Sequence, residues 1–370
     1  MKNTMKIIFA LFTSVSLISS VNAGELTVTG TAKATYNILS GGTVGANTSK
    51  GIGIANEIDF GAKGELDNGW TWNYQVQMDP GTGTIPSTTT NNGNAYIDDS
   101  RLEIGTNFGT IGIYVTEGGL DVDNAASRSV YGRPSDIGLS TGMADGPSID
   151  GFNNIQYHLP AGLLPFGTTF KAAYANGQSG AINSANAAGS TTDKYGDTAE
   201  QYQITLAPID GLKVGADYYR ESGAGTITQI VVQEFEAGSV FATYTAGPAS
   251  FGISRTLRAP LILGTGAAET VISNGDAAGG NADSVRLYTT NKYSAAFNVN
   301  DSLSLSYEME KSNREAIVNA AEYDIKASAI QAAYTMGGMT LAVSHGKTDN
   351  ASYSQNNDVT QTLLAVTMAF

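Results

Sequence analysis

The chain has 370 residues, of which 41% are hydrophobic and only 15% are charged, with 44 Gly and no Cys. The lack of cysteine excludes a disulfide scaffold and thiolate metal sites. The net charge of -14 argues against binding nucleic-acid phosphates, because such binding needs a surplus of Lys and Arg. The charged fraction is below the roughly one quarter typical of soluble proteins, yet the mean hydropathy is only -0.10.

The first 23 residues differ in composition from the rest. Lys2 and Lys6 form a positive start, an apolar stretch runs from Ile7 to Ile18, and a small-x-small pattern ends at Ala23. The alternative, a membrane anchor, needs an apolar stretch of about 18 to 20 residues. We therefore expect a secretory signal peptide over residues 1–23 and one domain over residues 24–370.

The first segment of this domain alternates with a period of two. From Glu25 to Asn37, small or apolar residues alternate with polar ones, and the pattern returns from Ile58 to Leu66. The turn Asp67-Asn68-Gly69 follows, and the alternation resumes from Trp70 to Met78. A period of two is typical of strands with one apolar face, and Asn-Gly favours a tight hairpin turn. These strands are long enough to cross a bilayer, which takes about 9 to 11 residues.

The same hairpin unit recurs to the end of the chain. Alternating segments span 102–115, 155–174, 202–218, 240–253, 293–309, 330–343 and 363–370. The longer polar connections between strands span 39–50, 80–94, 117–151, 177–199, 260–283 and 348–358. The count is about sixteen strands, an even number, as single-chain outer-membrane barrels have. We therefore predict an all-β, sixteen-stranded antiparallel transmembrane β-barrel, since a closed barrel satisfies every backbone group in lipid.

The last strand and the aromatic residues support a membrane location. Leu364, Val366 and Met368 alternate with polar or small residues, and the strand ends at Phe370, which we expect to anchor the C-terminus in the membrane. Many other aromatic residues share the apolar face of their strands, as interfacial girdles do. A sugar-binding track would instead need aromatic residues on the polar face, where Tyr114 and Tyr219 are the main candidates.

Several short motifs give the sequence a family resemblance. They are Gly24 to Gly30, Leu66 to Trp70, Asn107 to Thr110, Asn153 to Tyr157 and the final Phe370. In these the chain resembles the general bacterial porins, most closely the Rhodobacter-type porins of α-proteobacteria. The resemblance implies a homotrimer in the outer membrane of a Gram-negative bacterium. It also implies a third extracellular loop that folds into the lumen and constricts the pore.

The longest connection is the candidate for that loop, and it is rich in acidic residues. Its charged residues are Glu117, Asp121, Asp123, Asp136, Asp145, Asp150, Arg128 and Arg133. Folded inward, these carboxylates would create a negative potential at the narrowest point of the channel. The alternative is a solvated external loop, since acidic residues are common in Gly-rich loops.

Basic residues on the polar face of the strands are predicted to line the facing wall. They are Lys33, Lys63, Arg101, Lys171 and Lys213. A charge on the lipid face would cost about 2–4 kcal/mol at the bilayer midplane, so these side chains should face the lumen. The alternative is that they pair with Glu57, Asp59, Glu65 or Glu103 on neighbouring strands.

The sequence therefore predicts a porin for passive diffusion of small hydrophilic solutes and ions, with a mild cation preference and no catalytic residues. A porin selective for one nutrient is the nearest alternative; an outer-membrane enzyme or adhesin is another. Expected partners are two further copies of the chain, membrane lipid, lipopolysaccharide and the permeating solutes, with no nucleic acid. No cofactor or metal is expected, although Asp121-x-Asp123 leaves a structural Ca²⁺ open, because oxygen ligands suffice for it.

Overall fold

The computed structural model describes residues 24–41, 49–78, 99–139, 141–176, 198–222, 229–265, 270–274, 285–316 and 323–370. The expected signal peptide lies outside the described residues. Two short 3-10 helices, η1 (Ile149–Gly151) and η3 (Ala351–Tyr353), lie in loops. No helix among the described residues is long and apolar enough to cross a membrane.

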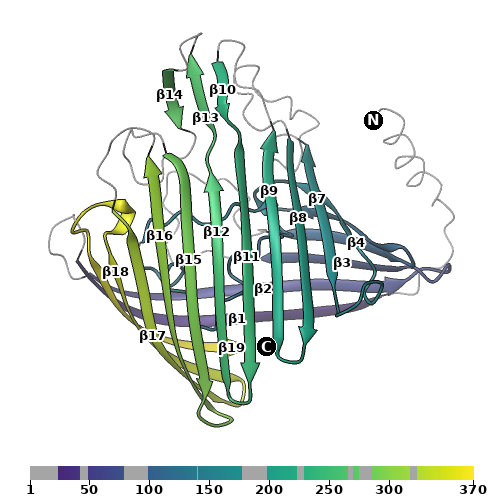
Figure 1. The fold of residues 1–370 in the computed structure, drawn as a ribbon. Coiled ribbons are helices and arrows are strands. Elements are labelled where there is room, and N and C mark those ends of the chain that lie inside the picture. The colour runs from purple at the N-terminus through teal and green to yellow at the C-terminus, as the bar shows by residue number, and fades with distance from the viewer. Residues whose placement is uncertain are drawn as a thin grey trace, which may run out of the picture.

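The predicted barrel is confirmed: sixteen strands close into one antiparallel ring (Figure 1). The ring contains β1 (Glu25–Gly41), β2 (Ser49–Glu65), β3 (Thr71–Met78), β4 (Ser100–Thr106), β5 (Gly109–Val115), β6 (Asn154–His158), β7 (Thr169–Asn176), β8 (Thr198–Ile209), β9 (Leu212–Ser222), β11 (Phe235–Ala246), β12 (Ala249–Ala259), β15 (Val285–Asn298), β16 (Leu303–Ala316), β17 (Ile325–Met336), β18 (Met339–Asp349) and β19 (Val359–Ala369).

The ring closes where the first strand pairs with the last. Their register runs from Thr31 opposite Ala369 to Gly41 opposite Val359. Beyond β19, the Gly30 N–H donates to the Phe370 carbonyl at 2.9 Å, and the Phe370 N–H donates back at 3.0 Å. A Cβ on Gly30 would come within 2.9 Å of the Phe370 ring, so glycine lets that ring lie against β1. Closure leaves no unpaired strand edge in the ring.

Side chains alternate strictly between the two faces of the wall. In β12, Phe251 and Ile253 are more than half exposed, whereas Ser254 and Thr256, on the opposite face, are buried. β18 has the same alternation, with exposed Leu341 and buried Ser344 on opposite faces. Apolar residues thus cover the outside of the barrel, and small or polar residues fill the inside. This inverted arrangement suits a wall with lipid outside and polar groups within.

Two features differ from the sequence prediction. Strands β1, β2 and β18 extend further into the long connections than the periodicity indicated, because the strands remain paired beyond the apolar band. A separate three-stranded sheet also forms from β10 (Gln229–Gln233), β13 (Ile262–Thr265) and β14 (Thr270–Asn274). The last two strands fall in a segment predicted as one connection, although its Ile, Val and Thr content favours strands.

The assignment of the two faces predicts a large effect of an arginine substitution at one position of β8 and a small effect at the next. Ile204 is 41% exposed on the outer face, so Ile204→Arg should lower the free energy of unfolding in lipid vesicles by about 2–4 kcal/mol. Thr205→Arg places the same side chain toward the lumen and should change it little. Denaturant titration of the vesicle-inserted protein measures both values, and an equal loss in the two variants would contradict the assignment of faces.

Candidate functional site

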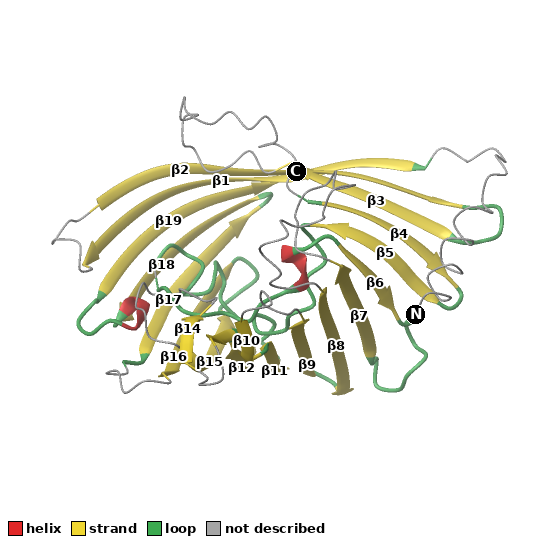
Figure 2. Ribbon diagram, turned by 90° about the horizontal axis from the view of Figure 1, so that it is seen from above, coloured by secondary structure: helices red, strands yellow, loops and turns green. Residues whose placement is uncertain are grey.

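Loop 3, residues 116–153, connects β5 to β6 and lies inside the ring of strands (Figure 2). Its first limb is bonded to successive inner-wall residues. The Leu120 N–H donates to Gln201 Oε1 of β8, and the Val122 N–H donates to Asp217 Oδ1 of β9 at 3.1 Å. Further on, Ser254 Oγ of β12 donates to the Asp123 carbonyl at 2.9 Å. The limb therefore follows the wall from β8 to β12.

The middle of loop 3 continues along the later strands. Ser294 Oγ of β15 donates to the Ala126 carbonyl at 2.6 Å, and the Val130 N–H donates to Ser306 Oγ of β16 at 3.0 Å. Gln331 of β17 exchanges hydrogen bonds with the backbone of residues 131–132, and Gln361 of β19 donates to the Ile137 carbonyl at 2.5 Å. Polar wall residues on successive strands thus satisfy the backbone of loop 3.

The returning limb is held by the same wall and by η3. The Ser352 N–H donates to the Thr141 carbonyl at 2.8 Å, and Thr290 Oγ1 of β15 donates to the Ala144 carbonyl at 3.2 Å. The Ile149 N–H then returns to Gln201 Oε1 at 2.9 Å. Leu120 also donates to Gln201 Oε1, so this side chain accepts hydrogen bonds from both limbs of loop 3.

A close approach fixes where the loop crosses β12. A Cβ on Gly252 would lie 1.7 Å from the Ala126 carbonyl oxygen, a distance that no side chain allows. Only glycine at this position lets the loop backbone reach the wall. The sequence alone does not reveal this contact, because a glycine in a strand need not mark a close approach. A Cβ on Gly51 of β2, for example, would have no atom within 4 Å.

A buried ionic network ties the loop to β15 and β16. Lys292 Nζ, 2% exposed, lies 2.9 Å from Asp123 Oδ2, 3.3 Å from Asp145 Oδ1 and 4.0 Å from Glu310 Oε1. On the loop, Arg133 forms two hydrogen bonds of 2.7 Å with Asp136 and lies 3.6 Å from both Asp145 and Glu310. Two cations thus neutralise carboxylates from the loop and the wall.

A second carboxylate of β16 accepts hydrogen bonds from hydroxyl groups of the loop. Glu308 is fully buried, and its Oε2 accepts from Ser127 Oγ at 2.5 Å and from Ser129 Oγ at 2.7 Å. Neither Lys292, Glu308 nor Glu310 was predicted from the sequence as a site residue. The signal was available, because all three lie on the polar face of strands whose outer face carries Tyr293, Tyr307 and Met309.

The remaining predicted loop residues lie at the start and end of loop 3. Glu117 Oε1 accepts a hydrogen bond from Arg101 Nη1 at 2.8 Å, so loop and wall are paired there. Arg128 is half-buried and donates to the carbonyl of Ala125 within the loop. Asp121 lies close to Asp123 of the first limb and to Asp150 of η1. Among the described residues, no cluster of acidic or histidine side chains has the arrangement of a metal site.

The carboxylates of the first limb have shifted pKa values. Burial, a hydrogen bond to Asp123 and the nearby charges raise the pKa of Asp121 to about 7. Burial opposes ionisation of Asp123, but the Lys292 ammonium, the hydrogen bonds from Asp121 and Lys292 and the Arg133 charge together outweigh it and lower the pKa of Asp123. The pair therefore holds a proton on Asp121 and a negative charge on Asp123 at mildly acidic pH.

The predicted basic residues all project from the inner face, but they have different partners. Lys33 lies 5.5 Å from the centre of the Tyr131 ring in loop 3. Lys63 pairs with Glu25 at 3.0 Å. Arg101 bonds to Gln75 as well as to Glu117. Lys171 is half-buried, Lys213 is exposed, and neither has an ion-pair partner among the residues that the structure describes.

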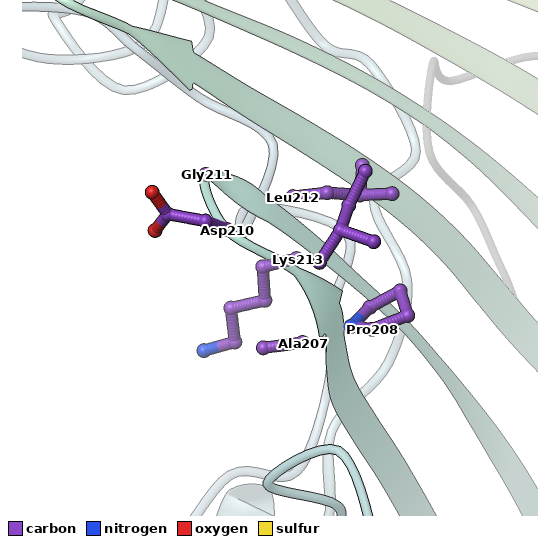
Figure 3. Close-up of a pocket in the computed structure, with 7 residues that line it drawn as sticks. Ala207, Pro208, Asp210, Gly211, Leu212 and Lys213 are labelled. Atoms are coloured by element: carbon purple, nitrogen blue, oxygen red, sulfur yellow. The ribbon is translucent and has the colours of Figure 1, made fainter.

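Lys213 lies near the short turn between β8 and β9. Its side chain, together with Ala207 and Pro208, lines a pocket of about 550 Å³, and Asp210 lies across the turn (Figure 3). The register shifts between Leu206 and Ile209, which widens the hairpin at this end. Lys213 is therefore accessible to ions at the mouth of the barrel that carries the short turns.

The inward aromatic residues do not form an open track. Tyr114 and Tyr219 are 2% and 1% exposed. The Tyr114 hydroxyl donates to Glu103 at 2.5 Å, and the Tyr219 hydroxyl donates to Glu221 at 2.6 Å. Both rings are thus covered by protein, and their faces are not available for stacking against a sugar.

Removing Lys292 should release loop 3 from the wall. Lys292→Met leaves Asp123 and Glu310 buried with one cation fewer, and breaking a buried ion pair typically costs about 3–5 kcal/mol. We expect noisier single-channel currents and a lower thermal unfolding temperature than in the wild type. Lys50→Met removes an exposed lysine and serves as control; currents and stability equal to that control would contradict the role of the network.

The raised pKa of Asp121 predicts a pH dependence. Its folded-state pKa of about 7 lies above the ordinary 3.8, so ionisation of Asp121 destabilises the folded loop progressively as pH rises from about 4 to 7. Current noise should therefore increase from pH 5 to pH 8, and Asp121→Asn should flatten this change. An identical pH profile in the variant would show that other groups are responsible.

Comparisons with known proteins agree with the barrel. A family model described as Gram-negative porin matches residues 9–370. The anion-selective porin of Comamonas acidovorans is 10% identical, with a TM-score of 0.64 over 94% of this chain and 100% of that one. Salmonella typhi OmpF, in a complex with daunomycin, is 14% identical, with a TM-score of 0.63 over 94% and 98%.

A mutant of the Rh. blastica porin is 12% identical, with a TM-score of 0.56 over 94% of this chain and 100% of that one. No curated protein sequence matches. The resemblance to porins deduced from the sequence is confirmed, and the family and barrel indicate an outer-membrane channel rather than an enzyme. The chain belongs to the Gram-negative porin family.

Proposed function

We propose that this porin is a passive diffusion channel for small hydrophilic solutes and ions, and that loop 3 narrows its lumen. The main support is the path of loop 3, which is bonded to inner-wall residues from β8 to β19. The loop occupies one side of the lumen, and the inner faces of β2 and β3 lie across from it (Figure 2). Steric and electrostatic selection by such a path needs no catalytic residue.

The charges available to a permeating ion are partly balanced. Glu117, Asp123, Asp136 and Asp145 each contact a cation, but they share only Arg101, Lys292 and Arg133, so their negative potential is partly neutralised. Across the lumen, Asp59 accepts hydrogen bonds from Gln75 and Gln77 and has no cation beside it among the described residues. Unpaired Lys171 and Lys213 oppose the remaining negative charge. We therefore propose a mild preference for cations, which the positive charges of Lys171 and Lys213 limit.

We also propose a homotrimer exported by way of a cleaved signal peptide. OmpT of Vibrio cholerae, described as a trimer, shares the fold at 14% identity and a TM-score of 0.56. The outer positions Ala32 and Ala34 on β1, with Thr362 on β19, are small, which allows a neighbouring barrel to approach the seam closely. Conductance rising in groups of three steps would support this assembly.

Planar-bilayer recordings test the channel and its selectivity. We expect stepwise conductance and a small reversal potential of cation sign in a salt gradient. The double substitution Lys171→Gln with Lys213→Gln should shift the reversal potential further toward cations, because it removes two unpaired positive charges. Absence of conductance would refute the channel, whereas clear anion selectivity of the wild type would refute only the preference. Saturation of liposome swelling with one solute would favour a nutrient-selective porin.

A further inference from the structure

Loop 8, residues 350–358, connects β18 to β19 and has an unusual backbone. Asn350, Ser352, Tyr353 and Asn356 all have positive φ angles, between 53° and 58°. Only two other non-glycine residues of the described chain do. This region is uncommon for non-glycine residues, and for a residue as bulky as tyrosine it is strained. Such strain persists only where the surrounding structure imposes it, so loop 8 must be held by its contacts.

The asparagines of loop 8 are held by hydrogen bonds within the loop. The Asn350 N–H donates to Asp358 Oδ1 at 3.1 Å, and the Asn356 N–H donates to Asn350 Oδ1 at 3.1 Å. Asparagine also tolerates a positive φ angle better than most residues do. These two bonds do not involve Ser352 or Tyr353, so the backbone of these two residues needs other support.

Ser352 and Tyr353 are bonded to the returning limb of loop 3. The Ser352 N–H donates to the Thr141 carbonyl at 2.8 Å, and the Ala144 N–H donates to the Tyr353 hydroxyl at 3.3 Å. The two loops also approach closely, because a Cβ on Gly142 would lie 2.3 Å from Ser352 Oγ. The most strained residues of loop 8 are therefore the ones that contact loop 3.

Tyr353 also anchors loop 8 to the wall. The η3 helix, which ends at Tyr353, lies beside the ends of β17 and β18 (Figure 2). The Tyr353 side chain is buried, and its hydroxyl lies 2.7 Å from Ser312 Oγ of β16. The centre of its ring lies 5.5 Å from that of Tyr288 of β15 and 5.4 Å from the Arg314 guanidinium of β16. One side chain thus joins loop 8, the wall and loop 3.

The facing part of the returning limb has few other partners. Among the described residues, the stretch 141–144 forms three hydrogen bonds to groups outside loop 3. Two of them involve Ser352 and Tyr353, and the third comes from Thr290 Oγ1 of β15. The first limb differs, because wall residues on successive strands from β8 to β12 are bonded to it. Loop 8 therefore supplies most of the hydrogen bonds that hold residues 141–144.

We propose that loop 8 is a strained clamp on the returning limb of loop 3, with Tyr353 as the positioning residue. The contacts that impose the backbone conformation of Ser352 and Tyr353 are the same contacts that hold residues 141–144. Losing them releases both loops together, and the freed limb then moves into the open part of the lumen and interrupts conduction. This inference rests on the proposed function, in which loop 3 narrows the lumen. Because the long loops of outer-membrane barrels are extracellular, the clamp couples the outer surface of the protein to its channel.

Planar-bilayer recordings of the full protein test the clamp. Tyr353→Leu removes the hydroxyl and the aromatic ring, so brief closures of the open channel should be about ten times as frequent as in the wild type. Loss of a buried hydrogen-bond partner changes an equilibrium by about that factor. Tyr353→Phe keeps the ring and removes only the hydroxyl, so it should give a smaller increase.

Tyr323→Leu is the matched control. The Tyr323 hydroxyl donates to Gln355 Oε1 of loop 8 at 2.9 Å, so this substitution removes a tyrosine that is bonded to loop 8 but leaves the bonds between loop 8 and loop 3. We expect the closures of the wild type. If closures in Tyr353→Leu are no more frequent than in this control, the clamp is refuted, whereas a wild type without conductance would refute the channel itself.

A cross-link separates the clamp from a general loss of stability. The chain has no cysteine, and a Cβ on Gly142 would lie 3.1 Å from Ser352 Cβ, near the roughly 3.5–4.5 Å of a disulfide. With Gly142→Cys and Ser352→Cys combined, the oxidised channel should close less often than the wild type. A reductant added on the side of the long loops should then raise the closures of the same channel at least to the wild-type frequency. Failure to form the disulfide, or closures unchanged by reduction, would overturn the proposal.

Discussion

The constraint on which this structure depends is that a strand in lipid has no water to satisfy its backbone. The pairing of β1 with β19 therefore does more than complete a sheet, since it removes the last two exposed edges. Once the ring is closed, the pleat alone decides which side chains meet lipid and which meet the lumen. The low charge content and near-zero mean hydropathy follow from this, because two opposite surfaces are interleaved residue by residue.

Inside the ring, a different cost controls the structure. Loop 3 carries backbone groups and carboxylates into a partly dry interior, where each must find a partner. Serine, threonine and glutamine on the wall satisfy the backbone, while Lys292 and Arg133 neutralise the acids. The acidic residues of the loop therefore help to hold loop 3 against the wall. Under the proposed function, only the charges that remain unpaired act on permeating ions.

The sequence allowed the strands, their faces and the place of the long loop to be predicted, because a period of two is a local pattern. The same rule predicted that Lys33, Lys63, Arg101, Lys171 and Lys213 face inward. It did not reveal that Arg101 pairs with Glu117 or that Asp123 pairs with Lys292, because loop residues have no period and their partners are far away in the chain. The extra sheet of β10, β13 and β14 was missed for a related reason, since its strands are short and lack a long alternating pattern.

The alternation also explains how neighbouring residues serve unrelated purposes. Glu310 and Lys311 are adjacent in β16, yet Glu310 is fully buried against loop 3 while Lys311 is exposed on the outer face. Asn291 and Lys292 divide in the same way on β15. The Glu310 charge lies among the cations and hydroxyl groups that hold loop 3, whereas Lys311 pairs with Asp324 on the outer face. A shift of one residue in register would exchange these surroundings and place both charges in unfavourable ones, so the closed register of the ring preserves the inner network.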